Sequence, residues 1–303
     1  MQAAHYLAMF ITAGGVCAVA APAQNTDRPP VLSVKTDLVT LAIAVVDRDG
    51  VFVAGLRPEH FTVYDNGEPR PIEFFSSEDL PATIGMVIDS SGSMRGKREQ
   101  VTAAGMAFAA LSHPLDELFT VNFNEMAWPG LRPGLAFTAD RDELRAALAG
   151  APAQGMSAVY DAVDRALAHL QHGTRDRKAL IVVSDGGDNA SARNFDDVLE
   201  SARQSMAIVY AVTLFEPDDH DARPRVLKRL ARATGGEAFT PRRASDVVRS
   251  FEQIAHELRS GYTIGIQPPD SVDAGFRSIR VVVNAGDGRQ LAARTRAGYY
   301  AGR

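Results

Sequence analysis

Apolar runs alternate with helix-like patterns through the middle of the chain. Residues 82–88 are almost entirely apolar and lie between Pro81 and a cluster of serine and glycine, which predicts a buried strand rather than a helix. Further strands are expected at residues 118–123, 179–183, 207–214 and 237–239. Helices are expected at residues 97–112, 140–149, 158–170, 195–206, 223–234 and 245–259. This alternation predicts a parallel sheet of βαβ units with both faces covered.

The pattern changes to alternation of apolar and polar positions on both sides of this region. Residues 39–45 alternate, Asp65-Asn66-Gly67 predicts a hairpin, and alternation returns at residues 262–266 and 279–283. Each flank is too small to bury a core by itself. We therefore expect residues 31–80 and 261–303 to pair into one antiparallel sandwich beside an α/β domain of residues 82–260. The predicted fold class is α/β, with a doubly wound, mostly parallel sheet inserted in or flanked by a small antiparallel β-sandwich.

The first 26 residues contain no Lys, Arg, Asp or Glu. Residues 9–23 are apolar and end in Ala21-Pro22-Ala23, which predicts a secretory signal peptide over residues 1–23 and an exported protein, periplasmic or extracellular. A membrane anchor is the alternative, but the run is short for a span and contains Gly14-Gly15, so no stable span is expected after cleavage. The single cysteine, Cys17, lies in this segment, so a cleaved chain would have no thiol chemistry.

Composition and net charge narrow the classes of partner that the chain can bind. The chain of 303 residues is 46% hydrophobic and 23% charged, as in ordinary globular proteins. Its formal net charge of -5 offers no basic footprint for nucleic acid, so we expect no nucleic-acid partner.

Side chains with hard oxygen atoms follow or precede three of the expected elements. Asp89, Ser91 and Ser93 follow the strand at 82–88, Ser157 precedes the helix at 158–170, and Asp185 follows the strand at 179–183. In an α/β sheet, ligands bind beyond the carboxyl ends of the strands, so these loops should converge. The spacing of Asp89, Ser91 and Ser93 would let alternate side chains of an extended turn point to one centre. The sequence therefore predicts a site for Mg²⁺, Mn²⁺ or Ca²⁺.

These residues resemble the von Willebrand factor type A domain, whose metal-ion-dependent adhesion site has the pattern D-x-S-x-S, a lone hydroxyl residue and S-D-G in this order. The resemblance implies hydroxyl ligands at Ser91, Ser93 and Ser157, carboxylates at Asp89 and Asp185, and Mg²⁺ as the preferred ion. It also implies a protein or peptide partner whose acidic side chain completes the metal site. The family usually has Thr where this chain has Ser157. The segments from Gly55 to Gly67 and from Gly298 to Tyr300 are similar to those of an exported bacterial subgroup.

Two other functions are left open by the residues alone. A metal-dependent hydrolase or phosphatase could use Asp89, with Arg95 and Lys97 nearby in sequence, although the metal loops contain no histidine or lysine to act as a general base. The second alternative is a structural scaffold whose metal site has no function. Because the metal loops lack a general base, we expect a non-catalytic binding module.

Two minor features could also bind ligands. His169 and His172 could share a metal but fit a helix terminus better. The loop Asp218-Asp219-His220-Asp221 is expected to be a solvated acidic loop, or alternatively a determinant of partner choice.

Overall fold

The structure, a computed structural model, describes residues 38–150, 153–215, 222–269 and 275–301. The predicted signal peptide at residues 1–23 and the acidic loop at residues 218–221 lie outside the described residues. Within the described part of the chain, no helix combines the length and the apolar character needed to cross a membrane.

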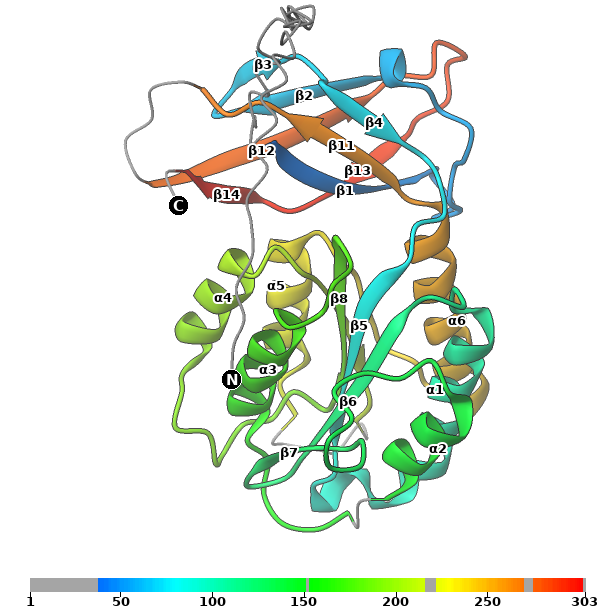
Figure 1. The fold of residues 1–303 in the computed structure, drawn as a ribbon, viewed down its shortest axis with the longest axis vertical. Coiled ribbons are helices and arrows are strands. Elements are labelled where there is room, and N and C mark those ends of the chain that lie inside the picture. Colours follow the sequence, from blue (N-terminus) through cyan, green and yellow to red (C-terminus); the bar gives the residue numbers. More distant parts are fainter. Residues whose placement is uncertain (1–37, 151–152, 216–221, 270–274, 302–303) are drawn as a thin grey trace, which may run out of the picture. The chain divides into compact units, whose positions relative to one another are not determined.

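A six-stranded sheet forms the centre of the α/β region, in the order β10-β9-β8-β5-β6-β7 (Figure 1). Neighbouring strands are parallel except for the edge pair β6 and β7, which is antiparallel. The strands are β5 (Ala82–Asp89), β6 (Glu117–Phe123), β7 (Ala127–Pro129), β8 (Arg177–Ser184), β9 (Ile208–Thr213) and β10 (Ala238–Phe239). Every residue of β5 is buried, because helices cover both faces of the sheet.

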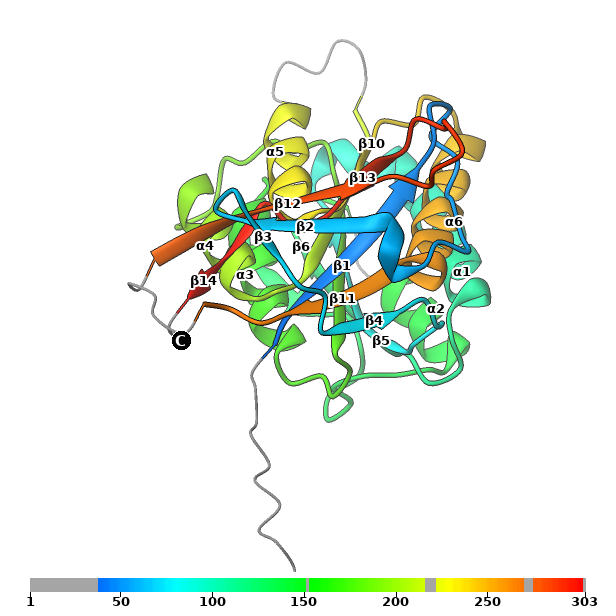
Figure 2. The same cartoon turned by 90° about the horizontal axis from the view of Figure 1, so that it is seen from above.

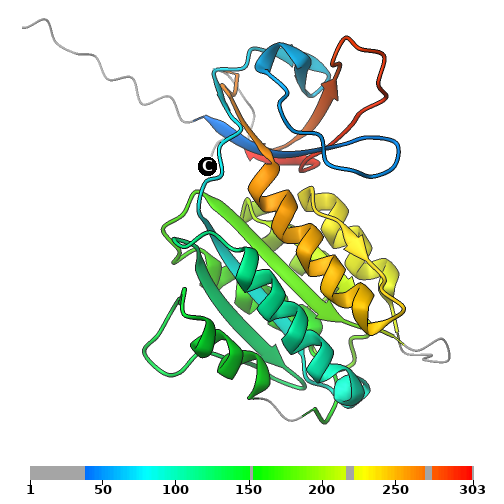
Figure 3. The same cartoon turned by 90° about the vertical axis from the view of Figure 1, so that its right-hand side faces the viewer.

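The covering helices divide into two groups. Helices α1, α2 and α6 contribute to the apolar core on one face, and α3, α4 and α5 contribute to the core on the other (Figure 3). Their bounds are α1 (Arg98–Leu111), α2 (Arg141–Ala149), α3 (Val159–Leu170), α4 (Phe195–Gln204), α5 (Pro224–Thr234) and α6 (Ala244–Ser260), with a 3₁₀ helix at Gly92–Lys97. As predicted, Asp140 caps α2, since its side chain accepts hydrogen bonds from the backbone N–H groups of Asp142 and Glu143.

Two four-stranded antiparallel sheets make up the rest of the described chain, in the orders β13-β1-β11-β4 and β14-β12-β2-β3. The strands are β1 (Val39–Val46), β2 (Phe61–Asp65), β3 (Glu68–Arg70), β4 (Phe74–Ser76), β11 (Tyr262–Ile266), β12 (Gly275–Val283), β13 (Ala292–Arg294) and β14 (Gly298–Ala301). A strand from before the α/β region pairs with one from after it in each sheet, β1 with β11 and β2 with β12. In Figure 2, β2 crosses over β1.

Both sheets bury their inner faces in one apolar cluster that includes Leu41, Val63 and Ile264. The predicted fold class is therefore confirmed, with a mostly parallel six-stranded sheet and two small antiparallel sheets.

The short strands were predicted only in part. Strand β7, only three residues long, was not predicted. Between β1 and β2, Phe52 forms only an isolated bridge with Val46. The hairpin predicted at Asp65-Asn66-Gly67 pairs β2 with the short strand β3.

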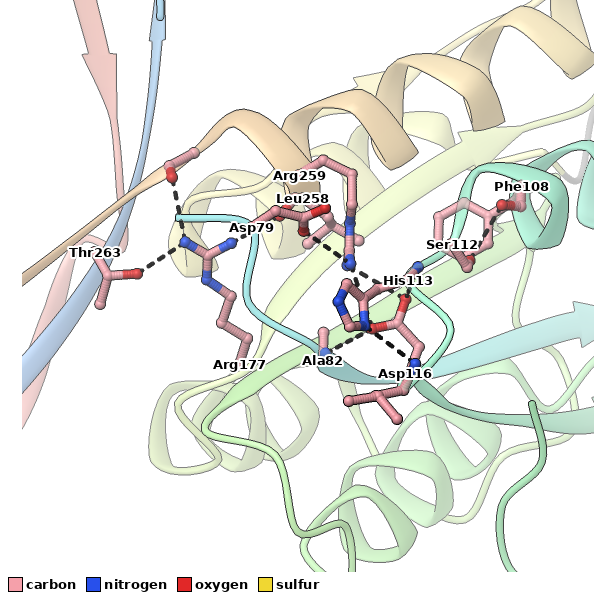
Figure 4. Close-up of polar contacts among 12 residues, drawn as sticks. Asp79, Ala82, Phe108, Ser112, His113, Asp116, Arg177, Leu258, Arg259 and Thr263 are labelled. Atoms are coloured by element: carbon pink, nitrogen blue, oxygen red, sulfur yellow. Dashed lines mark hydrogen bonds and ion pairs between the residues drawn. The ribbon is translucent and has the colours of Figure 1, made fainter. Parts of the chain in front are cut away.

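Ion pairs and hydrogen bonds connect the α/β region to the strand that follows it (Figure 4). The buried Asp116 carboxylate accepts hydrogen bonds from the backbone N–H of Ala82 at 2.7 Å and lies 3.3 Å from a guanidinium nitrogen of Arg259. The guanidinium of Arg177 donates to the backbone oxygen of Leu258 and to the hydroxyl of Thr263. These contacts fix the end of α6 and the start of β11 against the amino ends of the central strands.

Candidate metal centre

Asp89 is the last residue of β5 and has no exposed surface. Its carboxylate accepts hydrogen bonds from the backbone N–H of Ser91 at 2.8 Å, the hydroxyl of Ser184 at 2.7 Å and the hydroxyl of Ser157 at 3.2 Å. Burial raises the pKa of Asp89, and the hydrogen bonds from Ser91 and Ser184 oppose that rise. All three donors are neutral, so this buried carboxylate is hydrogen-bonded without being neutralised.

Asp185 joins the same cluster from the loop after β8. The hydroxyl of Ser93 donates to its carboxylate at 2.6 Å, and the hydroxyls of Ser91 and Ser93 lie 3.1 Å apart. The structure therefore brings all five predicted residues together, Asp89, Ser91, Ser93, Ser157 and Asp185, through a connected set of hydrogen bonds. Asp89 and Asp185 are buried while Ser93 is exposed, so the cluster opens to solvent at Ser93.

The local backbone is not the extended turn that the sequence spacing suggested. Ser91 is the N-cap of the 3₁₀ helix Gly92–Lys97, which contains Ser93. The two hydroxyls converge because this helix turns tightly directly after β5, and not because alternate residues of an extended chain share a face. The prediction of an extended turn is wrong, although the predicted proximity of the two serines is found.

Backbone contacts between the loops hold the cluster in place. The N–H of Gly92 donates to the backbone oxygen of Gly155 at 3.1 Å, and the N–H of Ser157 donates to the side chain of Asn189 at 2.8 Å. Gly186 has a φ of +82°, and an added Cβ there would lie 2.7 Å from the backbone oxygen of Arg223. The turn that positions Asp185 therefore requires glycine at this position.

The sequence interpretation missed two residues of this site. Ser184 orients Asp89, and a signal for it existed, because a serine ends an otherwise apolar strand that is expected beside residues 82–88. Asn189 fixes the backbone at Ser157 although 32 residues separate them, and no pattern in the sequence indicated this contact.

The two carboxylates of the cluster, Asp89 and Asp185, form no ion pair in the described part of the chain. The guanidinium of Arg98 donates to the hydroxyl of Ser90 at 2.7 Å and to the backbone oxygen of Leu148 at 2.8 Å. Burial lowers the pKa of Arg98 and the charge of Asp89 opposes that shift, so Arg98 acts on Asp89 through space without an ion pair. The cluster thus offers two carboxylates and three hydroxyls, a donor set that fits a hard divalent cation.

The two histidines have other contacts. The Nε2 atom of His169 lies 2.9 Å from the backbone oxygen of Ala136, and its ring packs on Phe119 and Phe137. The rings of His169 and His172 are 6.1 Å apart between centroids. The described residues contain no group of three or more His, Cys, Asp and Glu side chains arranged to hold a metal ion, so a metal at Asp89 would depend on serine hydroxyls.

Comparison with known proteins agrees with the fold. Residues 84–187 match the family model of the von Willebrand factor type A domain. The part of the chain from β5 to the turn after β8 is therefore similar to this domain. A comparison with curated proteins found no match.

Two bacterial structures illustrate the likeness in fold. A von Willebrand factor type A protein from Catenulispora acidiphila is 14% identical, with a TM-score of 0.54, over 88% of this chain and 74% of that one. The vWF domain of the type V pili tip protein Mfa5 from Porphyromonas gingivalis is 15% identical, with a TM-score of 0.51, over 64% of this chain and 99% of that one. At these identities the likeness is one of fold alone.

Proposed function

We propose that the chain is an exported, non-catalytic protein that binds a protein or peptide partner through a divalent cation. The residues that would hold the ion are Asp89, Ser91, Ser93, Ser157 and Asp185. The observation that carries this proposal is the pair of buried carboxylates, Asp89 and Asp185, surrounded by hydroxyl groups and not neutralised by a basic side chain within the described part of the chain. A buried carboxylate without a cation is costly, and a bound cation would offset that cost.

Mg²⁺ suits this donor set, and Mn²⁺ and Ca²⁺ have the same preference for oxygen ligands. A bound ion would supply a positive charge that attracts an acidic side chain of the partner. The exposed position of Ser93 gives such a side chain access to the cluster. The likeness in fold to a pilus tip protein, together with the apolar leader pattern, supports a role outside the cytoplasm.

The surroundings of the cluster favour binding over catalysis. The guanidinium groups of Arg95 and Arg98 donate to the backbone oxygens of Ala153 and Leu148, so neither is directed only toward the carboxylates. A phosphohydrolase would need a general base or an anion clamp beside the metal, and the five proposed ligands supply neither.

Affinity capture tests this function. The full chain is immobilised and exposed to the exported proteome of its source in Mg²⁺ and in EDTA, beside the Asp89→Asn variant, which keeps the shape of the side chain. We expect a partner that is retained in Mg²⁺, released by EDTA and absent from the variant. Equal capture under all three conditions, or metal-dependent hydrolysis of phosphate esters by the chain, would contradict the proposal.

A further inference from the structure

The hairpin between β6 and β7 lies directly beside the candidate metal centre. The backbone N–H of Ala158 donates to the backbone oxygen of Asn124 at 2.7 Å, and the N–H of Met156 donates to the carboxylate of Glu125 at 3.2 Å. Ser157, which contacts Asp89, lies between Met156 and Ala158 in the chain. The tip of the hairpin is therefore hydrogen-bonded to the residues on both sides of Ser157, at the edge of the cluster.

Two methionines at this edge are exposed although both are large and apolar. Met126, at the tip of the hairpin, is 73% exposed, and Met156 is 50% exposed. Met126 has the highest exposure among the large apolar residues that the structure shows at the surface. We call Met126 and Met156 the methionine pair. Methionine is flexible and polarisable, and exposed methionines suit surfaces that adapt to a partner's apolar side chains.

Charge at the same place restricts what can approach. The exposed carboxylate of Glu125 accepts a hydrogen bond from the backbone N–H of Met156, so a negative charge lies next to Met156. A metal ion at Asp89 would attract one carboxylate of a partner, while Glu125 would repel a second one nearby. This arrangement favours an isolated acidic residue over an acidic run.

We propose that the methionine pair binds an apolar side chain next to the partner's acidic residue, so that the partner motif is a single acid flanked by an aliphatic or aromatic residue. The inference rests on the proposed function, because the acid is placed by the metal. It adds a determinant of specificity that the metal ligands do not contain. The apolar contact would bury methionine surface that is exposed to water in the free protein. This burial would add to the affinity for the partner, separately from the contribution of the metal.

Selection of peptides tests the motif. A random heptapeptide library displayed on phage is selected on the full chain in Mg²⁺ and eluted with EDTA. The same selection is made on the double variant Met126→Ser/Met156→Ser and on Val51→Ser, a control in which a 60% exposed apolar residue of the antiparallel region is changed. We expect the wild type and the control to enrich peptides with one acid and an apolar neighbour. The double variant should lose the preference for the neighbour, and a selected peptide should bind it about tenfold more weakly.

The outcomes separate the two proposals. If the wild type enriches acidic peptides without an apolar neighbour, or if the double variant gives the same profile, the inference about the methionine pair is wrong and the metal-dependent function stands. If EDTA elutes no enriched peptides, or if the enriched peptides lack an acid, the proposed function is wrong and the inference fails with it.

Discussion

The two ends of the six-stranded sheet hold buried carboxylates in opposite electrostatic settings. At the end nearer β11, Asp116 is 3% exposed, accepts backbone hydrogen bonds and is paired with the guanidinium of Arg259. At the other end, Asp89 is fully buried and receives hydrogen bonds from serine and backbone donors alone. Burial and residue type are the same at both ends, and the presence of a cationic partner differs.

This difference distinguishes a structural carboxylate from a candidate binding site. The Asp116 end is neutralised within the chain, so nothing further is needed there. The carboxylates at the Asp89 end form no ion pair with a described basic side chain, which is the setting that a divalent cation would complete. If burial of an acidic residue were the only criterion, both ends of the sheet would be equally good candidates for a binding site.

Removal of the structural carboxylate should have the largest effect on stability. Asp116→Ala leaves the N–H groups of Ala82 and His113 unsatisfied and removes one of the two carboxylates paired with the partly buried Arg259, whose ion pair with Asp79 remains. We therefore expect a loss of about 3–5 kcal/mol in the free energy of unfolding. Urea unfolding measures this. Asp142→Ala, which removes a 90% exposed side chain paired with Arg145, is the control and should cost less than about 1 kcal/mol. Equal losses for both variants would contradict the structural role of Asp116.

Addition of metal should act at the other end. Mg²⁺ at about 100 times its Kd should raise the free energy of unfolding of the wild type by about 2.7 kcal/mol. Asp89→Asn should fold without Mg²⁺, since it replaces an uncompensated buried charge with a neutral group of the same shape, and should gain no such stabilisation. Urea unfolding with and without Mg²⁺ checks both statements, and the same stabilisation in the variant would place the ion elsewhere.

Ser184→Ala should have a smaller effect at the same end. The hydroxyl of Ser184 donates to Asp89 and accepts the N–H of Gly186 at 3.0 Å, so its loss should cost about 1–2 kcal/mol of stability and also weaken Mg²⁺ binding. Ser90→Ala is the matched control, because the hydroxyl of this equally buried serine contacts Arg98 instead of Asp89. If the two variants bind Mg²⁺ with equal affinity, Ser184 does not position Asp89.

The smallest expected effect is a change in pH dependence on the side of the sheet near β13. Glu257 is 4% exposed, accepts a hydrogen bond from Tyr210 and pairs with Arg294, and burial raises its pKa above the ordinary value of 4.5. The folded chain then binds this proton more tightly than the unfolded chain, so this group lowers stability as pH rises from 4.5 through the folded pKa. Glu257→Gln should remove that contribution. Unfolding of both proteins across this pH range measures it, and identical slopes would show that Glu257 does not titrate there.

The regular elements could be predicted because their signals are local. The apolar run at residues 82–88 predicted a buried strand, and the pattern at residues 140–149 predicted a helix, since each pattern reflects burial within a few residues. Strand β7 could not be predicted, because a three-residue edge strand that ends in Pro129 has no periodicity and depends on its pairing with β6.

The site was predictable in composition but not in geometry. Asp89 and Asp185 could be placed at one edge of the sheet because parallel strands end there together. The 3₁₀ helix that brings Ser91 to Ser93, and the contact of Asn189 with Ser157, depend on how separate loops pack, and residue spacing does not express that.

Calorimetric titration of the full chain with Mg²⁺ tests the central claim most directly, namely that the uncompensated end of the sheet binds a divalent cation. The account predicts saturable binding of a single ion to the wild type, its loss in Asp89→Asn, and its retention in Asp142→Ala, whose change lies on the surface of α2. Absence of binding to the wild type, or equal binding to Asp89→Asn, would contradict the account.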